Sequence, residues 1–387
     1  MRYTPIIFSK LVEPLDRRRF EAIVVRHNGD AYDKSFFSWN HLMALVYAQL
    51  SNLDCLRALE AGWNANPQHH YHLGCGALSS STLADANRRR PVEVFAEAFA
   101  LIAGQLDRHC RNDGKIFLRL IDSTPIPLGK LCAWAKSNGR IRGMKVHVVY
   151  DPHHDLPRII DITNANVNDA QIGRTVAIIP GATHVFDKAY VQYPWWTEIH
   201  RSDAFFVARP KKNMGLRVLK TRPLEQPQGD GFRVLADEEV ALSSKGDSKL
   251  PIPMRRIRVE RDNGKVLDFI TNAMARTAVE IGNLYKSRWQ IELLFRWLKQ
   301  HLKIRKFLGN NDNAIKLQIY AAVIAYALLR LAARTHKVVH PILRFTDLVR
   351  AFLLERRDIA AIERPPRTNP RHKIERSSPN QMSFSYA

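Results

Sequence analysis

The chain has 387 residues, and its 59 lysines and arginines against 37 aspartates and glutamates give a formal net charge of +22. This excess favours a polyanionic partner such as nucleic acid, because phosphate binding strengthens with the number of neutralising cations. Apolar residues make up 45% of the chain, which is ample for hydrophobic cores, and the length predicts two or three domains.

Membrane and disulfide-bonded classes are disfavoured. No secretory signal is visible in the first residues, and the most apolar run, residues 319–329, is too short to span a bilayer. The four cysteines form no Cys-x-x-Cys pair and are typical of reduced thiols in a cytosolic protein. His69, His70 and His72 lie near Cys75, but their spacing fits no common zinc pattern.

The first hundred residues carry helical signals. Thr82 and Asp85 have the spacing of a helix start, and Pro91 is expected to open another helix. Short helices beside the triplet Arg88–Arg90 are typical of a helix-turn-helix unit that binds a DNA end, but the same arginines could cap a helix C-terminus. Both interpretations remain open from the sequence.

From Lys115 the pattern is that of strands. Residues 116–121 are expected to form a strand that leads into Asp122, and Pro125 should stop its pairing. Further strands are expected at residues 145–150, 158–163, 183–186 and 205–208, of which the third ends at Asp187.

Residues 211–265 combine short strand-like runs with many turn residues, which predicts a β-rich insertion. Residues 266–270 then resume the core. Thr277 and Glu280 have the spacing of a capping box, which is expected to begin one long helix carrying Glu292. Two further helices and a tail rich in proline, serine and arginine follow.

Four side chains of different chemistry are spaced along that predicted helix, namely Tyr285, Arg288, Glu292 and Lys299. On a continuous helix they would share an edge about 60° wide. A surface ion pair between Arg288 and Glu292, worth about 0.3 kcal/mol, is the simplest interpretation, but it does not account for the tyrosine and the lysine. An acid that holds a metal ion among groups that hold phosphates accounts for all four.

Asp122 and Asp187 each follow a predicted strand, and Glu292 lies on a helix that can pack beside the same sheet. In a mixed α/β layer the ends of adjacent strands converge, so that these three acids can meet in one cleft. Their oxygens suit Mg²⁺ or Mn²⁺, and two such ions about 3.5–4 Å apart can drive an in-line displacement at phosphorus. Either aspartate alone would more often be a turn or helix cap.

The chain resembles the DDE transposases of bacterial insertion sequences, in the insertion-sequence-four family with its Tyr-Arg-Glu-Lys motif. The resemblance rests on Ile121–Thr124, on Asp187–Tyr190 and on Leu284–Glu292 with Lys299. It extends to Thr163–Asp169 and Ser81–Asn87.

This resemblance implies an α/β protein with an RNase H-like mixed-sheet catalytic core and a β-rich insertion, preceded by an all-helical N-terminal domain and followed by C-terminal helices. It implies Asp122, Asp187 and Glu292 as the metal-binding catalytic triad, and Tyr285 and Arg288 as DNA contacts. Lys299 is implied as a third DNA contact.

The same resemblance implies cut-and-paste transposition in the bacterial cytoplasm. Family members cleave double-stranded DNA at terminal inverted repeats, often through hairpinned ends, and join the freed ends to target DNA, commonly as homodimers. Two departures stand out: Ala189 replaces a frequent glycine, and residues 211–265 contain no tryptophan that could hold a flipped base, so the base-holding residue stays open.

Two other functions remain compatible with the residues, a DNA-binding relative without activity and an RNase H-like nuclease without strand transfer. The expected domains are a helical DNA-binding domain at 1–112, a catalytic core at 113–210 and 266–335, the insertion at 211–265, and a C-terminal helix with a mobile basic tail at 336–387.

Overall fold

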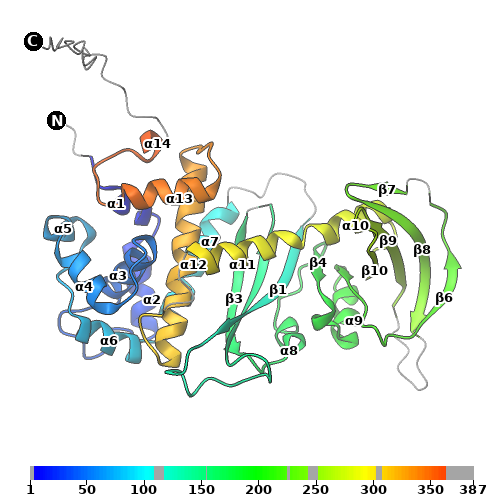
Figure 1. Ribbon diagram of the computed structural model, residues 1–387, viewed down its shortest axis with the longest axis horizontal. Coiled ribbons are helices and arrows are strands. Elements are labelled where there is room, and N and C mark those ends of the chain that lie inside the picture. Colours follow the sequence, from blue (N-terminus) through cyan, green and yellow to red (C-terminus); the bar gives the residue numbers. More distant parts are fainter. Residues whose placement is uncertain are drawn as a thin grey trace, which may run out of the picture.

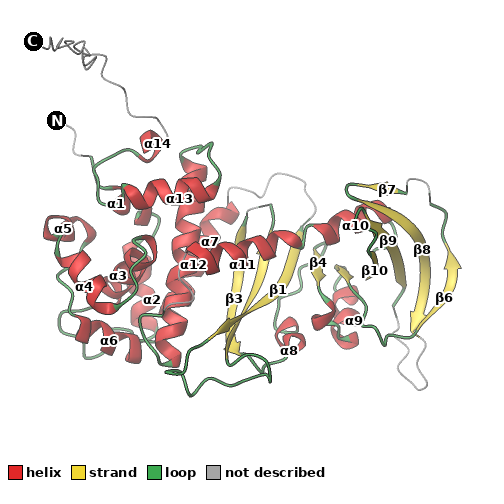
Figure 2. Ribbon diagram, in the orientation of Figure 1, coloured by secondary structure: helices red, strands yellow, loops and turns green. Residues whose placement is uncertain are grey.

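The computed structural model describes residues 4–108, 117–153, 155–224, 227–242, 252–301 and 307–362. The expected basic tail beyond residue 362 lies outside these residues. The protein is elongated, with helices at one end, a strongly twisted sheet in the middle and long antiparallel strands at the other end (Figure 1). Figure 2 shows that one end is helical, whereas strands make up the middle and the other end, with a few helices packed against them.

The helical end combines the first helices of the chain with its last ones, because the long apolar helix α12 packs against α3 and α7. The helix start predicted at Thr82 is displaced, since α6 begins at Ser80 and Thr82 lies inside it. The helices of this end are α1 (Ile7–Val12), α2 (Arg17–Arg26), α3 (Ser38–Leu50), α4 (Leu56–Asn64), α5 (His70–Leu73), α6 (Ser80–Arg89), α7 (Val92–Arg108), α12 (Asp312–Thr335), α13 (Ile342–Ala351) and α14 (Ile359–Ile362).

Within the described residues one helix, α12, is long and apolar enough to cross a membrane, and 83% of its most apolar window is buried inside the protein. The predicted apolar run at 319–329 is therefore the centre of a longer core helix. Burial on every side explains why this segment is apolar around its whole circumference.

A single ten-stranded sheet follows the order β3-β2-β1-β4-β5-β10-β9-β8-β6, with β7 paired to β8. Strands β1, β4 and β5 are parallel to one another, and the other pairs are antiparallel. The strands are β1 (Leu118–Pro127), β2 (Gly143–Asp151), β3 (Leu156–Asn164), β4 (Thr183–Phe186), β5 (Phe205–Ala208), β6 (Leu216–Thr221), β7 (Gln228–Gly229), β8 (Phe232–Leu242), β9 (Met254–Arg261) and β10 (Val266–Thr271).

The prediction that Pro125 ends the first strand is wrong. Strand β1 continues to Pro127, and Pro125 lies opposite Lys145 of β2. The parallel pairing with β4 stops at Ile121, so that beyond this point only one side of β1 is paired. A residue without an N–H group is tolerated on such an open edge.

Two cores cover the faces of the sheet. One runs from the helical end onto the face that carries α10 (Ala278–Lys286) and α11 (Trp289–His301). The other is built around Phe186, Trp195 and Trp196 beneath α8 (Asp169–Gly173) and α9 (Tyr193–Arg201). In Figure 1 α11 crosses the sheet from the β-rich end toward α12.

The predicted long helix after Thr277 is two helices. The capping box forms as expected, with Thr277 and Glu280 satisfying each other's backbone N–H groups. The helix then stops at Lys286, because the N–H of Arg288 donates to the carbonyl of Tyr285 three residues earlier, in place of the four-residue spacing. Arg288 therefore lies in the junction between α10 and α11.

Candidate active site

The strand register brings Asp122 and Asp187 to equivalent positions. Ile121 of β1 lies opposite Phe186 of β4 in the last parallel pair, and each aspartate is the next residue along its chain. Ile121 and Phe186 are buried in the core beneath α9. Since side chains alternate along extended chain, both aspartates belong to the opposite face, which carries α10 and α11.

Arg288 joins Asp122 to Glu292. Its Nη1 atom donates to Oδ2 of Asp122 at 2.7 Å, and its Nη2 atom donates to Oε1 of Glu292 on the first turn of α11. The guanidinium is largely buried, with 17% of its side chain exposed. A residue in the helix junction thus ties the third acid to the first.

Asp187 is held by two other groups. The hydroxyl of Tyr285 on α10 donates to its Oδ1 atom at 3.4 Å, and Nη1 of Arg209, just after β5, lies 3.9 Å from the same oxygen. The ring of Tyr285 stacks on Phe269 of β10, with 4.4 Å between the ring centroids. Arg209 was not predicted from the sequence, although a cation directly after a parallel strand was a usable signal.

Burial dominates the electrostatics of the site. It raises the pKa of Asp122 to about 6, against the opposing effect of Arg288, and the neighbouring charges of Asp187 and Glu292 raise this pKa further. Burial, with a contribution from Asp187, also raises the pKa of Tyr285 to about 12. The charges of Asp187 and Glu292 therefore both reach Asp122.

Lys299 lies on α11 two helical turns beyond Glu292 and is partly exposed. By the rise of an α-helix this places it about 10 Å along the axis from that acid. The structure therefore brings Tyr285, Arg288 and Glu292 together with the two aspartates, and sets Lys299 further along the same helix.

A cavity of about 700 Å³ adjoins the helix junction. Its wall includes Arg288 and Tyr285 and, from the other strands and helices, Phe232, Arg261 and Trp289. Half of the Trp289 side chain is exposed. Trp289 directly follows Arg288, inside the Tyr-Arg-Glu-Lys motif. That position in the sequence could have indicated Trp289 as a candidate site residue.

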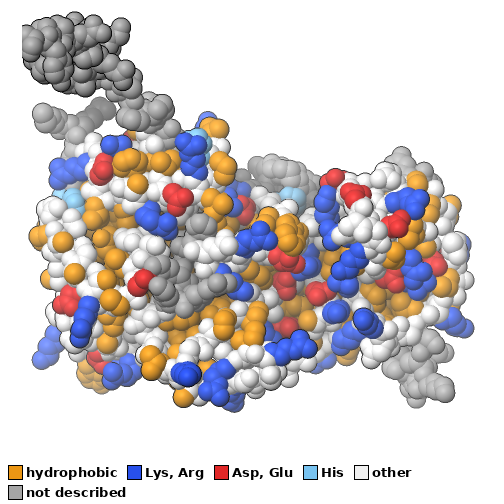
Figure 3. All heavy atoms as spheres, viewed as in Figure 1, with side chains coloured by type: hydrophobic (Ala, Val, Ile, Leu, Met, Phe, Trp, Pro, Cys, Tyr) orange, Lys and Arg blue, Asp and Glu red, His pale blue; other side chains and the backbone are white. Residues whose placement is uncertain are grey.

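The chemistry of the three acids fits a hard divalent cation, because carboxylate oxygens are the ligands that Mg²⁺ and Mn²⁺ prefer. Within the residues that the structure describes, no three Asp, Glu, His or Cys side chains are close enough together to hold a metal ion. The guanidinium of Arg288 lies between two of the acids instead. On the face shown in Figure 3, acidic side chains gather near α11 with lysines and arginines on either side.

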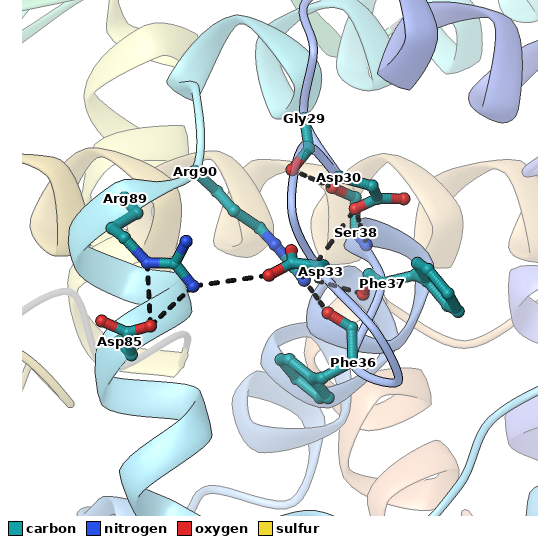
Figure 4. Close-up of polar contacts among 9 residues, drawn as sticks. All are labelled: Gly29, Asp30, Asp33, Phe36, Phe37, Ser38, Asp85, Arg89 and Arg90. Carbon is teal, nitrogen blue, oxygen red and sulfur yellow. Dashed lines mark hydrogen bonds and ion pairs between the residues drawn. The ribbon is translucent and has the colours of Figure 1, made fainter.

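The arginine triplet of the N-terminal part has internal contacts. Arg90 is 3% exposed, and it donates to Asp33 and to the carbonyls of Phe36 and Phe37 (Figure 4). Arg90 therefore holds the loop from Asp33 to Phe37 of its own domain.

Arg89, the neighbour of Arg90, pairs with Asp85 one turn earlier on α6 and with Asp33 across the same loop (Figure 4). Arg88 is exposed. Of the three arginines, only Arg88 thus keeps a position open to solvent without a described ion pair.

A family model described as the transposase DDE domain matches residues 114–328, and one described as a domain of unknown function (DUF4372) matches residues 4–76. The first match covers more than half of the 387 residues, so the chain belongs to the DDE transposase family. This confirms the resemblance drawn from the motifs, and membership of the family implies the use of divalent metal ions.

Similar proteins are named as transposases. The chain is 67% identical over 304 residues to y4zB of Sinorhizobium fredii, whose name describes it as a transposase, covering 79% of this chain and 85% of that protein. It is 30% identical over 291 residues, 74% of each chain, to a Geobacillus stearothermophilus protein named as the transposase of insertion sequence element IS5377. The chain is accordingly a DDE transposase.

A solved structure is also similar, the cryo-EM structure of the piggyBac transposase synaptic complex with hairpin DNA. Its TM-score is 0.45 at 10% sequence identity, and the match covers 90% of this chain and 78% of that one.

Proposed function

We propose that this transposase catalyses metal-dependent cut-and-paste transposition of an insertion sequence, with Asp122, Asp187 and Glu292 as its catalytic acids. The observation that carries the proposal is the strand register, which sets the two aspartates side by side at the end of parallel strands. Arg288 connects Asp122 to the third acid, Glu292, which lies 105 residues beyond Asp187 in the chain.

The three carboxylates would hold the divalent cations, and we propose Mg²⁺ or Mn²⁺ in a two-metal site. When bound, the ions supply Lewis-acid stabilisation of the attacking and leaving oxygens during in-line displacement at phosphorus. We further propose that strands β3-β2-β1-β4-β5 with α11 form an RNase H-like core, and that the strands after β5 up to β9 are an insertion within it. Residues 1–112 would then be a DNA-binding domain.

Arg288 has two states in this proposal. Without DNA its guanidinium neutralises Asp122 and Glu292, as the structure describes. Guanidinium forks also bind phosphate through paired hydrogen bonds, so a phosphate of the transposon end can take over this side chain and leave the carboxylates to the metal. Tyr285 and Lys299 would contact the same DNA, with Lys299 reaching phosphates further from the reacting bond.

The partner is double-stranded DNA, both the terminal repeats and the target. Arg261, Lys286 and Arg288 around the cavity, together with the net charge of +22, support this assignment. We propose a homodimer that pairs two ends in the bacterial cytoplasm.

The test uses a labelled DNA duplex that carries the end of the element, a target plasmid and Mg²⁺. Glu292→Gln removes one charge at nearly constant shape, so we expect end cleavage to be lost while end binding persists. Glu198→Gln, an exposed acid on α9, is the matched control and should cleave normally. Normal cleavage by Glu292→Gln would reject the assignment of Glu292. Cleavage by the wild-type protein without joining of the ends to the plasmid would favour a nuclease.

A further inference from the structure

A polar cluster lies on the sheet face opposite α11, directly behind Asp122. Ser123 of β1 pairs in register with His147 of β2, and Lys145 lies two residues before His147 on the same side of its strand. These side chains point toward α8, whose first residue is Asp169. None of them belongs to the proposed catalytic set.

Asp169 is the centre of this cluster. Its Oδ1 atom accepts from the hydroxyl of Ser123 at 2.8 Å and lies 3.0 Å from Nζ of Lys145. Nδ1 of His147 is 3.6 Å from the same oxygen. Burial lowers the pKa of His147 to about 4, so the imidazole is neutral and Lys145 is the cation that balances Asp169.

Further contacts fix the cluster on the remaining sides. Lys145 also donates to the carbonyl of Val167, and Nε2 of His147 lies 2.9 Å from the hydroxyl of Thr163 on β3. All of these side chains are mostly buried, with 12% of Lys145 and 19% of Asp169 exposed. A buried ionic cluster with several partners has one favoured geometry, which suits it to hold a neighbour in place.

Ser123 connects this cluster to the catalytic face. Its backbone N–H donates to Oδ1 of Asp122 at 2.8 Å, while its hydroxyl is held by Asp169. The other carboxylate oxygen of Asp122 is the one bound by Arg288. If Arg288 leaves for DNA, the Ser123 N–H is the described contact that still orients Asp122.

We propose that Asp169 is a positioning residue for the metal-binding carboxylate of Asp122, and that it acts through Ser123. This inference rests on the proposed function, since it assigns a role toward a metal site at Asp122. Groups that orient metal ligands from behind commonly change metal affinity by about 10–100-fold when removed. Asp169 itself touches no reacting atom, because it lies on the other face of the sheet.

The test measures Mn²⁺ binding by electron paramagnetic resonance in the full chain bound to its transposon end, without turnover. Ser123→Ala keeps the Asp169–Lys145 pair and removes only the connecting hydroxyl, so we expect about tenfold weaker binding. Ser123→Thr retains a hydroxyl and should restore affinity. Thr163→Val, which removes a hydroxyl of the same cluster that does not reach Asp122, is the matched control and should bind within about twofold of wild type.

A double-mutant cycle tests the route. Asp169→Asn should weaken Mn²⁺ binding in the wild-type background and add little once Ser123 is alanine, whatever its effect on thermal stability. Wild-type affinity in Ser123→Ala, or an equal loss in Thr163→Val, would overturn the inference. Should Ser123→Ala fail to fold, Ser123→Cys gives the same comparison with a weakened donor.

Asp122→Asn separates this inference from the proposed function. If that variant binds Mn²⁺ like wild type, the proposed metal site is wrong. If it loses binding while Ser123→Ala does not, only the positioning role fails.

Discussion

Two arginines, Arg90 and Arg288, both bridge acidic and polar groups, yet their surroundings differ. Arg90 is 3% exposed and donates to one carboxylate and two backbone carbonyls of a single loop (Figure 4). Arg288 donates to carboxylates on two separate elements and lines a cavity of about 700 Å³. The first has only structural partners, whereas the second has partners that a metal ion and a phosphate could replace.

The difference shows how to separate a structural arginine from a functional one. The carboxylate of Asp33 and the two carbonyls that Arg90 binds all belong to one loop, so these contacts hold that loop in place. The partners of Arg288 are two acids, and burial, with a smaller contribution from the charge of Glu292, raises the pKa of Asp122. A cation beside such acids favours their charged forms. Variants of the two arginines and their partners should therefore fail in different ways.

The largest effect on activity is expected when Asp122, one of the two acids bound by Arg288, is replaced. Asp122→Asn should reduce end cleavage by at least about a thousandfold, because metal-ion stabilisation of the transition state amounts to several kcal/mol. Its melting temperature should stay within a few degrees of wild type. Cleavage assays and thermal unfolding check this, and retention of cleavage would remove Asp122 from the site.

Removal of Arg90 should act on stability instead. Arg90→Ala breaks a buried ion pair with Asp33 and removes the guanidinium donor from the carbonyls of Phe36 and Phe37, of which the second keeps the N–H of His41. We therefore expect a loss of about 3–5 kcal/mol in the free energy of unfolding. Arg88→Ala, its exposed neighbour, should change this free energy by less than about 0.5 kcal/mol. Urea unfolding measures both, and equal stability of the two variants would contradict the structural role of Arg90.

Removal of Arg288 should change two affinities in opposite directions. Without the internal cation, DNA-free Arg288→Ala should bind Mn²⁺ about tenfold more tightly, which corresponds to about 1.4 kcal/mol. The same variant should bind the transposon end more weakly, and Arg288→Lys should restore only part of this binding because lysine lacks the guanidinium fork. Unchanged Mn²⁺ affinity would show that Arg288 does not compete with the metal.

A pH dependence of stability is expected at the helical end. Burial lowers the pKa of His41 to about 3, and its imidazole is held by Asn87. Below pH 6.5 the unfolded chain therefore binds a proton that the folded protein excludes. As the pH decreases from 6.5 toward 3, this residue should lower the free energy of unfolding by about 1.4 kcal/mol per pH unit.

Unfolding at pH 7 and pH 5 measures that slope. His147 and His184 also have pKa values lowered to about 4 and should add to it. His41→Gln should reduce the slope by the share of one histidine, and an unaltered slope would contradict the buried neutral state of His41.

Part of the local structure around the candidate site could be predicted from the sequence, because its signals are local. Asp187 follows a strand as expected, and the capping box at Thr277 predicted the helix start. The junction at Arg288 could not be predicted, since Tyr285 to Lys299 fit one helix by periodicity and only the tertiary contacts of Arg288 favour a break. The cluster around Asp169 was missed for a related reason, because cross-strand register decides which polar residues meet.

The continuation of the sheet was equally non-local. Strand β10 pairs with both β5 and β9, so the β-rich segment extends the central sheet instead of forming a separate one. Pro125 inside β1 is another example, because the edge on which it is tolerated is open only where the pairing with β4 has stopped. That pairing involves residues about 60 positions further along the chain and could not be predicted locally.

The most direct test of the metal site is a crystal structure of the protein with its transposon end and Mn²⁺, examined by anomalous scattering. The account predicts anomalous peaks beside the carboxylate oxygens of Asp122, Asp187 and Glu292, with Arg288 turned toward a DNA phosphate. Peaks elsewhere, or Arg288 still bridging Asp122 and Glu292 in the loaded complex, would contradict it.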